Sequence, residues 1–123
     1  MHWPFYQYHS ARNLLQSPLH STLKEQGACF GEVGGFERPN WFSRDGAKAQ
    51  YEYSYRRQNW FEFYAAEHLA MRESVGVYDI SSFGKFEVSG AGALATLQRL
   101  SCADIDAEPG KVIYTQWLND RGG

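Results

Sequence analysis

The sequence has no excess of basic residues, no long apolar run and no paired cysteine motif. Its 12 Lys and Arg against 14 Asp and Glu give a formal charge of −2, so the basic surface of a nucleic-acid-binding protein is not expected. Its apolar runs are a few residues long, far below the roughly 20 residues of a membrane-spanning helix. Cys29 and Cys102 lie far apart, outside any C-x-x-C pattern. Reduced thiols in the core are therefore favoured over a disulfide or a metal site.

Several motifs of enzyme chemistry are absent as well. There is no G-x-G-x-x-G, P-loop, H-E-x-x-H or G-x-S-x-G pattern to support nucleotide binding, zinc hydrolysis or serine acyl transfer. His68 stands beside Glu67 on an expected helix and is interpreted as a surface residue, not a base. Asp104, Asp106 and Glu108 alternate in a segment that favours a solvated loop over an acid–base pair. We therefore assign no catalytic residue and no metal ligand.

Aromatic residues are abundant, at 16% of the 123 residues, and many fall in the stretches 3–8 and 41–64. With 43% hydrophobic residues, the chain is apolar enough to form a globular core. Its length of 123 residues allows at most one domain. The aromatic stretches predict either a docking surface or anchors that fold back onto the protein's own core. Arg38, Arg56 and Arg57 lie among them, where they can bind an anion or stack on the neighbouring tryptophans.

Three segments have the signals of an α-helix. Ser17 and Pro18 suit the start of a short helix that Gly27 ends. From Phe61, apolar residues repeat every fourth position until Gly76, which predicts a helix of about four turns. The third amphipathic pattern, from Ala93 to Leu100, follows Gly90 and Gly92. We expect helices over about 18–26, 61–75 and 93–100.

Strand signals are shorter and are separated by turns. The pair Gly34-Gly35 and the nearby Pro39 break regular structure, so a long loop is expected there. Ser82 to Gly84 is expected to be a tight hairpin turn from which Phe83 projects. Residues 119–123 form a further turn, which leaves the preceding strand without a partner and suggests that the sequence is cut inside a larger domain. The expected strands are 28–33, 77–81, 85–88 and 112–118, with an exposed excursion of at most one short strand over 45–59.

Several segments also resemble a known family. The first group resembles the folate-binding fold of the glycine-cleavage T-protein, an aminomethyltransferase; it comprises RESVGVYDISSFGKFEVSG (72–90), LQRL (97–100) and YTQWLNDRGG (114–123). The second group looks like the subgroup fused behind an FAD-dependent amine oxidase domain, as in dimethylglycine and sarcosine dehydrogenases; it comprises GACFGE (27–32), FERPNWF (36–42) and QNWF (58–61). Together they cover nearly the whole chain.

The resemblance implies an α+β fold, namely the N-terminal part of the T-protein-like folate-binding fold, with short antiparallel strands and two to three helices. Residues 1–16 are interpreted as an irregular arm and residues 17–123 as an incomplete N-terminal portion of that domain. In the family, a flavin domain oxidises an N-methylated glycine and the folate domain captures the one-carbon unit on tetrahydrofolate. The resemblance thus implies tetrahydrofolate for the parent domain and FAD for an upstream domain that this chain lacks.

Two site residues follow from the resemblance. The family's T-proteins have His-Met-Gly where this chain has Ser82-Phe83-Gly84, so Phe83 replaces a methionine that lines the folate cavity. Tyr114 matches a tyrosine of the same cavity, where a phenol can stack on a pterin, although a core aromatic explains it equally well. The family's catalytic aspartate is expected beyond Gly123. Tyr114 and Phe83 are therefore the folate-binding candidates.

The resulting hypothesis is a fragment of a flavin-dependent dimethylglycine or sarcosine dehydrogenase, inactive by itself. Its expected partners are folate and a methylated amine in the parent protein, with self-association of the fragment through its unpaired strand edge. The alternatives are a non-catalytic docking module that uses aromatic loops and an aminomethyltransferase of the glycine-cleavage system. A bacterial cytoplasmic location is preferred to the mitochondrial matrix.

Overall fold

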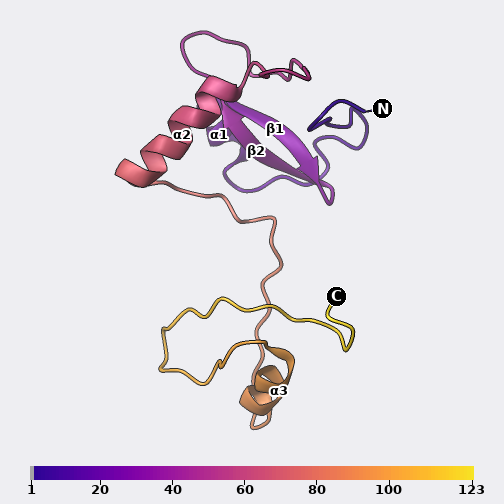
Figure 1. The fold of residues 1–123 in the computed structure, drawn as a ribbon, viewed down its shortest axis with the longest axis vertical. Coiled ribbons are helices and arrows are strands. Elements are labelled where there is room, and N and C mark those ends of the chain that lie inside the picture. The colour runs from indigo at the N-terminus through magenta and orange to yellow at the C-terminus, as the bar shows by residue number, and fades with distance from the viewer. Residues whose placement is uncertain (1) are drawn as a thin grey trace. The chain divides into compact units, whose positions relative to one another are not determined.

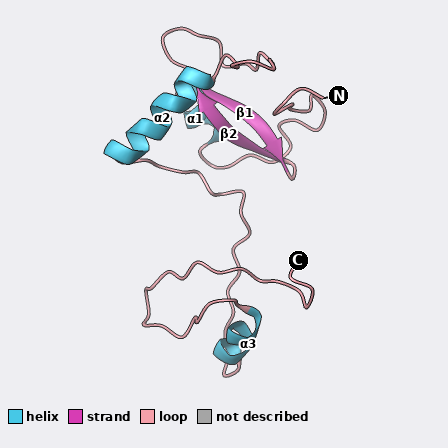
Figure 2. Ribbon diagram, in the orientation of Figure 1, coloured by secondary structure: helices cyan, strands magenta, loops and turns pink. Residues whose placement is uncertain are grey.

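The computed structural model describes residues 2–123, which group into two units, one ending at Gly84 and one spanning Lys85–Gly123. None of the helices in this part of the chain has the length and apolar character needed to cross a membrane. Figures 1 and 2 show its helices and strands: α1 (His20–Glu25), β1 (Ala28–Val33), β2 (Phe36–Phe42), α2 (Phe61–Glu73) and α3 (Ala93–Leu100).

The two strands form an antiparallel hairpin in the first unit. The predicted long loop after Gly34 is wrong, because β2 follows directly and Val33 pairs with Phe36. Gly34 and Gly35 have φ angles of 60° and 85°, the conformation that a two-residue hairpin turn requires and that glycine adopts without strain. Pro39 is tolerated in the strand because the register shifts beside its partner, and at such a bulge a missing N–H costs little.

The core of the first unit lies where α2 packs against β2. Figure 1 shows one end of α2 beside the hairpin. Trp41 of β2 is 1% exposed, and its ring stacks on that of Phe63 in α2 with centroids 5.4 Å apart. The backbone N–H of Phe42 donates to the Glu67 carboxylate of α2 at 3.1 Å. Cys29, opposite Trp41, is also buried. One aromatic contact and one hydrogen bond thus join the helix to the sheet.

The cysteine prediction is confirmed in part. Cys29 and Cys102 are both free thiols. Cys29 belongs to the buried core, as expected, whereas Cys102 is exposed and the core placement predicted for it is wrong. The difference has a local cause, because Cys29 lies in a paired strand and Cys102 lies just after α3 in a unit without buried side chains.

The helix predictions are confirmed with shifted ends. The first helix starts at His20, three residues after Ser17, whose hydroxyl accepts the Leu19 N–H at 3.2 Å. The second ends at Glu73, ahead of Gly76. The third spans Ala93–Leu100. Helix signals depend on residues within a few positions of each other, so the predicted helices form in both units.

The strand predictions beyond the hairpin are wrong. Residues 77–81, 85–88 and 112–118 form no strand. The stretch 45–59 is mostly exposed, as predicted, and contains no strand, which the prediction of at most one short strand allows. In place of the hairpin turn 82–84, the Phe83 N–H donates to the Ile80 carbonyl at 3.0 Å, and Gly84 has no positive φ. An alternating pattern gives a strand only where a second strand lies beside it. The closing turn is confirmed, with the Gly122 N–H donating to the Asn119 carbonyl at 3.0 Å.

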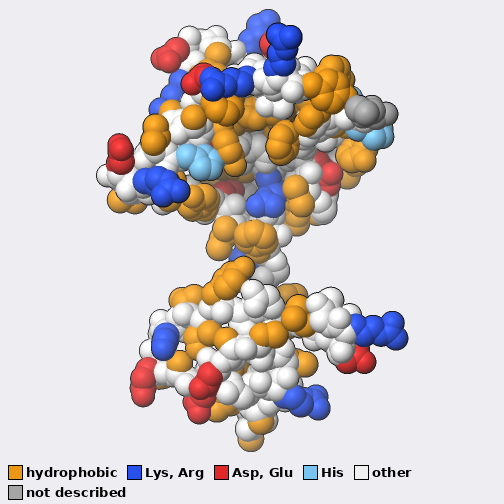
Figure 3. Space-filling view, in the orientation of Figure 1, with side chains coloured by type: hydrophobic (Ala, Val, Ile, Leu, Met, Phe, Trp, Pro, Cys, Tyr) orange, Lys and Arg blue, Asp and Glu red, His pale blue; other side chains and the backbone are white. Residues whose placement is uncertain are grey.

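The second unit is held by few contacts. An isolated bridge joins Ser101 to Trp117, whose indole N–H also donates to the Ser101 hydroxyl at 3.0 Å. No side chain of residues 85–123 is buried. Hydrophobic side chains accordingly lie on the surface of this unit, as they do on parts of the first (Figure 3).

Candidate functional site

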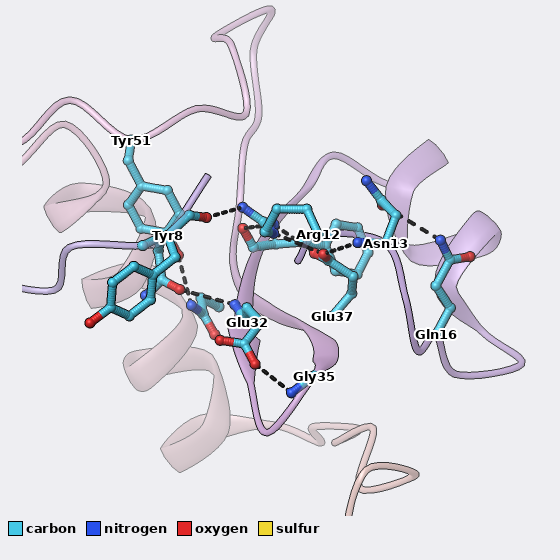
Figure 4. A network of polar contacts seen from close by, with 11 residues as sticks. Tyr8, Arg12, Asn13, Gln16, Glu32, Gly35, Glu37 and Tyr51 are labelled. Atoms are coloured by element: carbon cyan, nitrogen blue, oxygen red, sulfur yellow. Dashed lines mark hydrogen bonds and ion pairs between the residues drawn. The ribbon is translucent and has the colours of Figure 1, made fainter. Parts of the chain in front are cut away.

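The most buried charge of the first unit is the Glu37 carboxylate on β2, whose residue is 4% exposed. The Arg12 guanidinium donates to it twice, from Nη2 at 2.6 Å and from Nε at 2.8 Å, and the Asn13 N–H donates at 2.6 Å (Figure 4). The Arg12 hydrogen bond outweighs burial and lowers the pKa of Glu37. A buried carboxylate with a lowered pKa and all its partners in place is suited to holding structure, not to transferring protons.

Together with this ion pair, several hydrogen bonds fasten residues 7–15 to the hairpin. The Glu37 N–H donates to the Leu15 carbonyl at 2.9 Å, and the Glu32 N–H donates to the Gln7 side-chain oxygen at 3.0 Å. The Gln7 N–H in turn donates to the Tyr53 hydroxyl at 2.8 Å. The sequence did not indicate this network, because its two charges are 25 residues apart and neither belongs to a recognisable motif.

Aromatic rings pack together beside the network. Tyr51 and Tyr53 stack with centroids 5.7 Å apart, and Trp60 meets Tyr51 edge-on at 5.0 Å. Burial raises the pKa of Tyr51 to about 12. These rings act as anchors to the protein's own core, one of the two alternatives raised by the sequence. Other aromatic side chains remain exposed, as a docking surface would require; they are Trp3, Phe5, Tyr8 and Tyr55.

The turn that carries Phe83 lies against the start of β2. The Phe83 ring is 53% exposed, and the Arg38 guanidinium lies over it at 5.2 Å from the ring centroid. The Asp79 carboxylate accepts hydrogen bonds from the Ser17 hydroxyl and, at 3.0 Å, from the Ser81 N–H. A surface depression too small to admit a water molecule lies at this junction, lined by Ser17, Phe36, Glu37, Arg38, Pro39, Asp79 and Ser82.

Of the two alternatives raised for the arginines, anion binding and stacking, Arg38 and Arg57 show stacking, but on other rings than the neighbouring tryptophans. Arg38 stacks on Phe83 instead of Trp41. Arg57 lies 4.3 Å from the ring centroid of Phe61 and forms an exposed ion pair with Glu62 at 3.1 Å. Sequence neighbours were poor guides, because the ring that each arginine meets depends on how the turns fold.

The second unit contains Tyr114, which is 89% exposed. An open hollow of about 430 Å³ lies in the same unit, lined by Asp106, Ala107, Glu108, Pro109 and Lys111. The preceding Asp104 accepts hydrogen bonds from Gln98 and the Asp106 N–H, which lower its pKa. The acidic segment is thus the solvated loop that was predicted.

His68 is an exposed residue of α2, as predicted. Its Nδ1 lies 2.8 Å from the Tyr64 carbonyl oxygen, and the rings of the two residues are in contact. Within residues 2–123, no three His, Cys, Asp or Glu side chains gather in a way that could hold a metal ion.

The two folate candidates belong to different units, Phe83 to the first and Tyr114 to the second. A pterin is a flat aromatic ring system, and folate carries carboxylates on its tail. The exposed Phe83 ring and the adjacent Arg38 cation suit one side of such a ligand. Neither the depression nor the hollow is lined by Phe83 or Tyr114. The residues present thus fit one wall of a folate site and do not enclose a pocket.

Comparison with known proteins adds a family and several relatives. The model of the GCVT N-terminal domain matches residues 19–123. Over its whole length the chain is 52% identical to the 4-methylaminobutanoate oxidase (formaldehyde-forming) of Paenarthrobacter nicotinovorans, of which it covers 15%. It is 37% identical to the mouse mitochondrial pyruvate dehydrogenase phosphatase regulatory subunit; this alignment covers 98% of the chain and 14% of that protein. It is 36% identical to human mitochondrial sarcosine dehydrogenase; this alignment covers 93% of the chain and 15% of that protein. The chain therefore spans about 15% of the length of these curated relatives.

Proposed function

Since the chain belongs to the family of the GCVT N-terminal domain, we propose that it is the opening part of the folate-binding domain of a flavin-dependent amine oxidase or dehydrogenase. The observation that carries this proposal is the 52% identity to 4-methylaminobutanoate oxidase, which extends over all 123 residues. Identity at this level leaves little room for a different fold. The parent protein then belongs with the flavoproteins that oxidise N-methylated amines.

The proposed substrate class is an amine that carries both an N-methyl group and a carboxylate. Sarcosine and 4-methylaminobutanoate, named for two of the relatives, share these groups and differ in the length of the chain between them. Dimethylglycine and sarcosine, the substrates in the hypothesis drawn from the sequence, both belong to this class. Substrate choice is assigned to the flavin-binding part of the parent protein.

The proposed role of this chain is to build one wall of the folate site and to hold it in place. Phe83 offers an apolar face there, Tyr114 is a second candidate wall, and the other walls are assigned to the rest of the domain. Bound tetrahydrofolate would supply the acceptor for the one-carbon unit. No residue of this chain is assigned a catalytic step.

The test uses the full-length protein that contains this chain. It is purified, its flavin absorption is recorded, and it is mixed without oxygen with sarcosine, dimethylglycine or 4-methylaminobutanoate. We expect at least one of these amines to bleach the flavin band. With oxygen present, we expect added tetrahydrofolate to lower the free formaldehyde released per amine oxidised. A protein without flavin, or one whose flavin none of the three amines reduces, would overturn the proposal.

A second candidate function is docking without catalysis. It is favoured by the 37% identity to a phosphatase regulatory subunit over 98% of the chain, together with the exposed aromatic residues of the N-terminal segment. The same purified protein distinguishes the two. A docking subunit would show no amine-dependent change in any flavin band, whereas an oxidase would.

A further inference from the structure

We propose that Asp79 and Arg38 are positioning residues for Phe83, which hold the turn 80–83 so that one face of the phenyl ring stays open to folate. This inference rests on the proposed function, because Phe83 has a ligand to meet only if the domain binds folate.

Asp79 anchors the turn to the start of α1. Its carboxylate accepts a hydrogen bond from the Ser17 hydroxyl, 62 residues earlier in the chain. The same hydroxyl accepts the Leu19 N–H at 3.2 Å, so the anchor is fixed at its far end by backbone. The other Asp79 oxygen accepts the Ser81 N–H at 3.0 Å. An aspartate that binds the backbone two residues ahead favours a turn, and here the Phe83 N–H closes it on the Ile80 carbonyl.

Arg38 holds the ring itself. It extends from β2, where it pairs with Gly31 of β1, and its guanidinium lies 5.2 Å from the Phe83 ring centroid. Within residues 2–123, no carboxylate lies within ion-pair distance of Arg38. A guanidinium placed over an aromatic ring is attracted to the face of that ring and so helps to hold the ring in position. The cation therefore covers one part of the phenyl group and leaves the rest exposed.

Burial does not fix Phe83, because its side chain is 53% exposed. A phenyl ring placed only for packing would be expected to lie under the sheet, as Phe63 does against Trp41. Phe83 is instead kept at the surface by a hydrogen-bonded turn and a stacked cation. Such an arrangement presents an apolar face, which a flat aromatic ligand can use.

The same unit provides a matched control. Arg57 lies 4.3 Å from the centroid of the Phe61 ring; Phe61 is the first residue of α2, and Arg57 precedes it by four residues. Its ion pair with Glu62 is exposed on both sides. Arg57→Met therefore removes the same kind of contact from the same unit without touching the turn.

The experiment measures tetrahydrofolate affinity in the full-length protein by calorimetric titration. Arg38→Met and Asp79→Asn are each expected to raise the Kd about 3- to 30-fold, the range that one lost cation–π or hydrogen-bond contact produces. Arg57→Met should change the Kd less than twofold. Arg38→Lys, which keeps a cation, should recover part of the affinity. The rate of flavin reduction by the amine should stay unchanged in Arg57→Met, which lies outside the proposed site.

A double variant tests whether Arg38 acts through Phe83. If it does, adding Arg38→Met to Phe83→Leu should weaken binding no further than Phe83→Leu alone. Additive losses, or an Arg38→Met protein that binds as tightly as Arg57→Met, would overturn the inference and leave the proposed function standing. A wild-type protein that oxidises the amine but does not bind tetrahydrofolate would overturn both the folate assignment and this inference. If Asp79→Asn does not fold, the Arg38 variants decide.

Discussion

The two units of this chain differ in how much they bury, although both carry apolar residues throughout. The first contains a paired hairpin, a fully buried Trp41 and a buried, neutralised Glu37. The second has a well-formed helix α3, but every side chain of residues 85–123 is at least partly exposed. Apolar content alone therefore did not produce a core. The first unit has one because strands distant from the helix in sequence lie beside it.

The most direct test of the difference in burial between the two units is to remove the central side chain of the first unit. Trp41→Ala should lower the free energy of unfolding by about 3–5 kcal/mol, because it deletes a fully buried indole and leaves a cavity. The measurement is denaturant unfolding followed by circular dichroism. The matched control is Trp117→Ala in the second unit, which should cost less than about 1 kcal/mol because the indole is exposed. Equal losses would contradict the distinction between the units.

The buried ion pair should have the next largest effect. Glu37→Gln should lower the free energy of unfolding by about 2–4 kcal/mol, since it leaves the Arg12 cation without its carboxylate. The control, Glu62→Gln, breaks the exposed pair with Arg57 and should cost at most about 0.5–1 kcal/mol. A smaller loss for Glu37→Gln than for Glu62→Gln would show that the arm is not fastened by this pair.

Thiol reactivity compares the two units in one experiment. Burial raises the pKa of Cys29 to about 11, so at pH 8 only about one molecule in a thousand carries the reactive thiolate there. Cys102 is exposed. With a thiol reagent followed by peptide mass spectrometry, Cys102 should be labelled first and Cys29 about a hundredfold more slowly or only after unfolding. Similar labelling rates would show that the core of the first unit opens readily.

The smallest expected effect is the pH dependence from Glu37. Its pKa is lower in the folded protein than in the unfolded chain, chiefly through the Arg12 hydrogen bond. Its stabilisation is therefore fully present above the unfolded pKa and is lost as the pH falls through the folded pKa. The free energy of unfolding should decline in acid, and Glu37→Gln should make that decline shallower. An unchanged slope in Glu37→Gln would assign the acid sensitivity to other carboxylates.

The elements predicted correctly from the sequence are those with local causes. The period from Phe61 gave α2, the glycine pair before Ala93 gave the start of α3, and the apolar run from Ala28 gave β1. The errors are equally informative. Gly34-Gly35 predicts a break in regular structure, but a glycine pair is also a hairpin turn signal. The alternation over 112–118 predicts a strand, but only an isolated bridge at Trp117 forms there.

The candidate site was predicted only in outline. Phe83 and Tyr114 follow from the resemblance to a family and not from any local pattern. Local patterns could not reveal that Arg38 stacks on Phe83, that Ser17 binds Asp79, or that Arg12 neutralises Glu37. These partners lie 45, 62 and 25 positions apart, and no local period extends so far.

Local features of the sequence suffice to predict the helices, the first strand, the free thiols, the solvated acidic loop and the family, because propensity, spacing and motif identity are properties of neighbouring residues. The tertiary structure alone decided which glycines turn, which alternating segments pair, which carboxylate is buried and which ring each arginine meets. Those outcomes depend on contacts between distant residues, whose free energy is gained only once the chain has folded and the entropy of closing the loops between them has been lost. Trp41 and Val112 show the difference, since only Trp41 has a second strand and a helix to cover it.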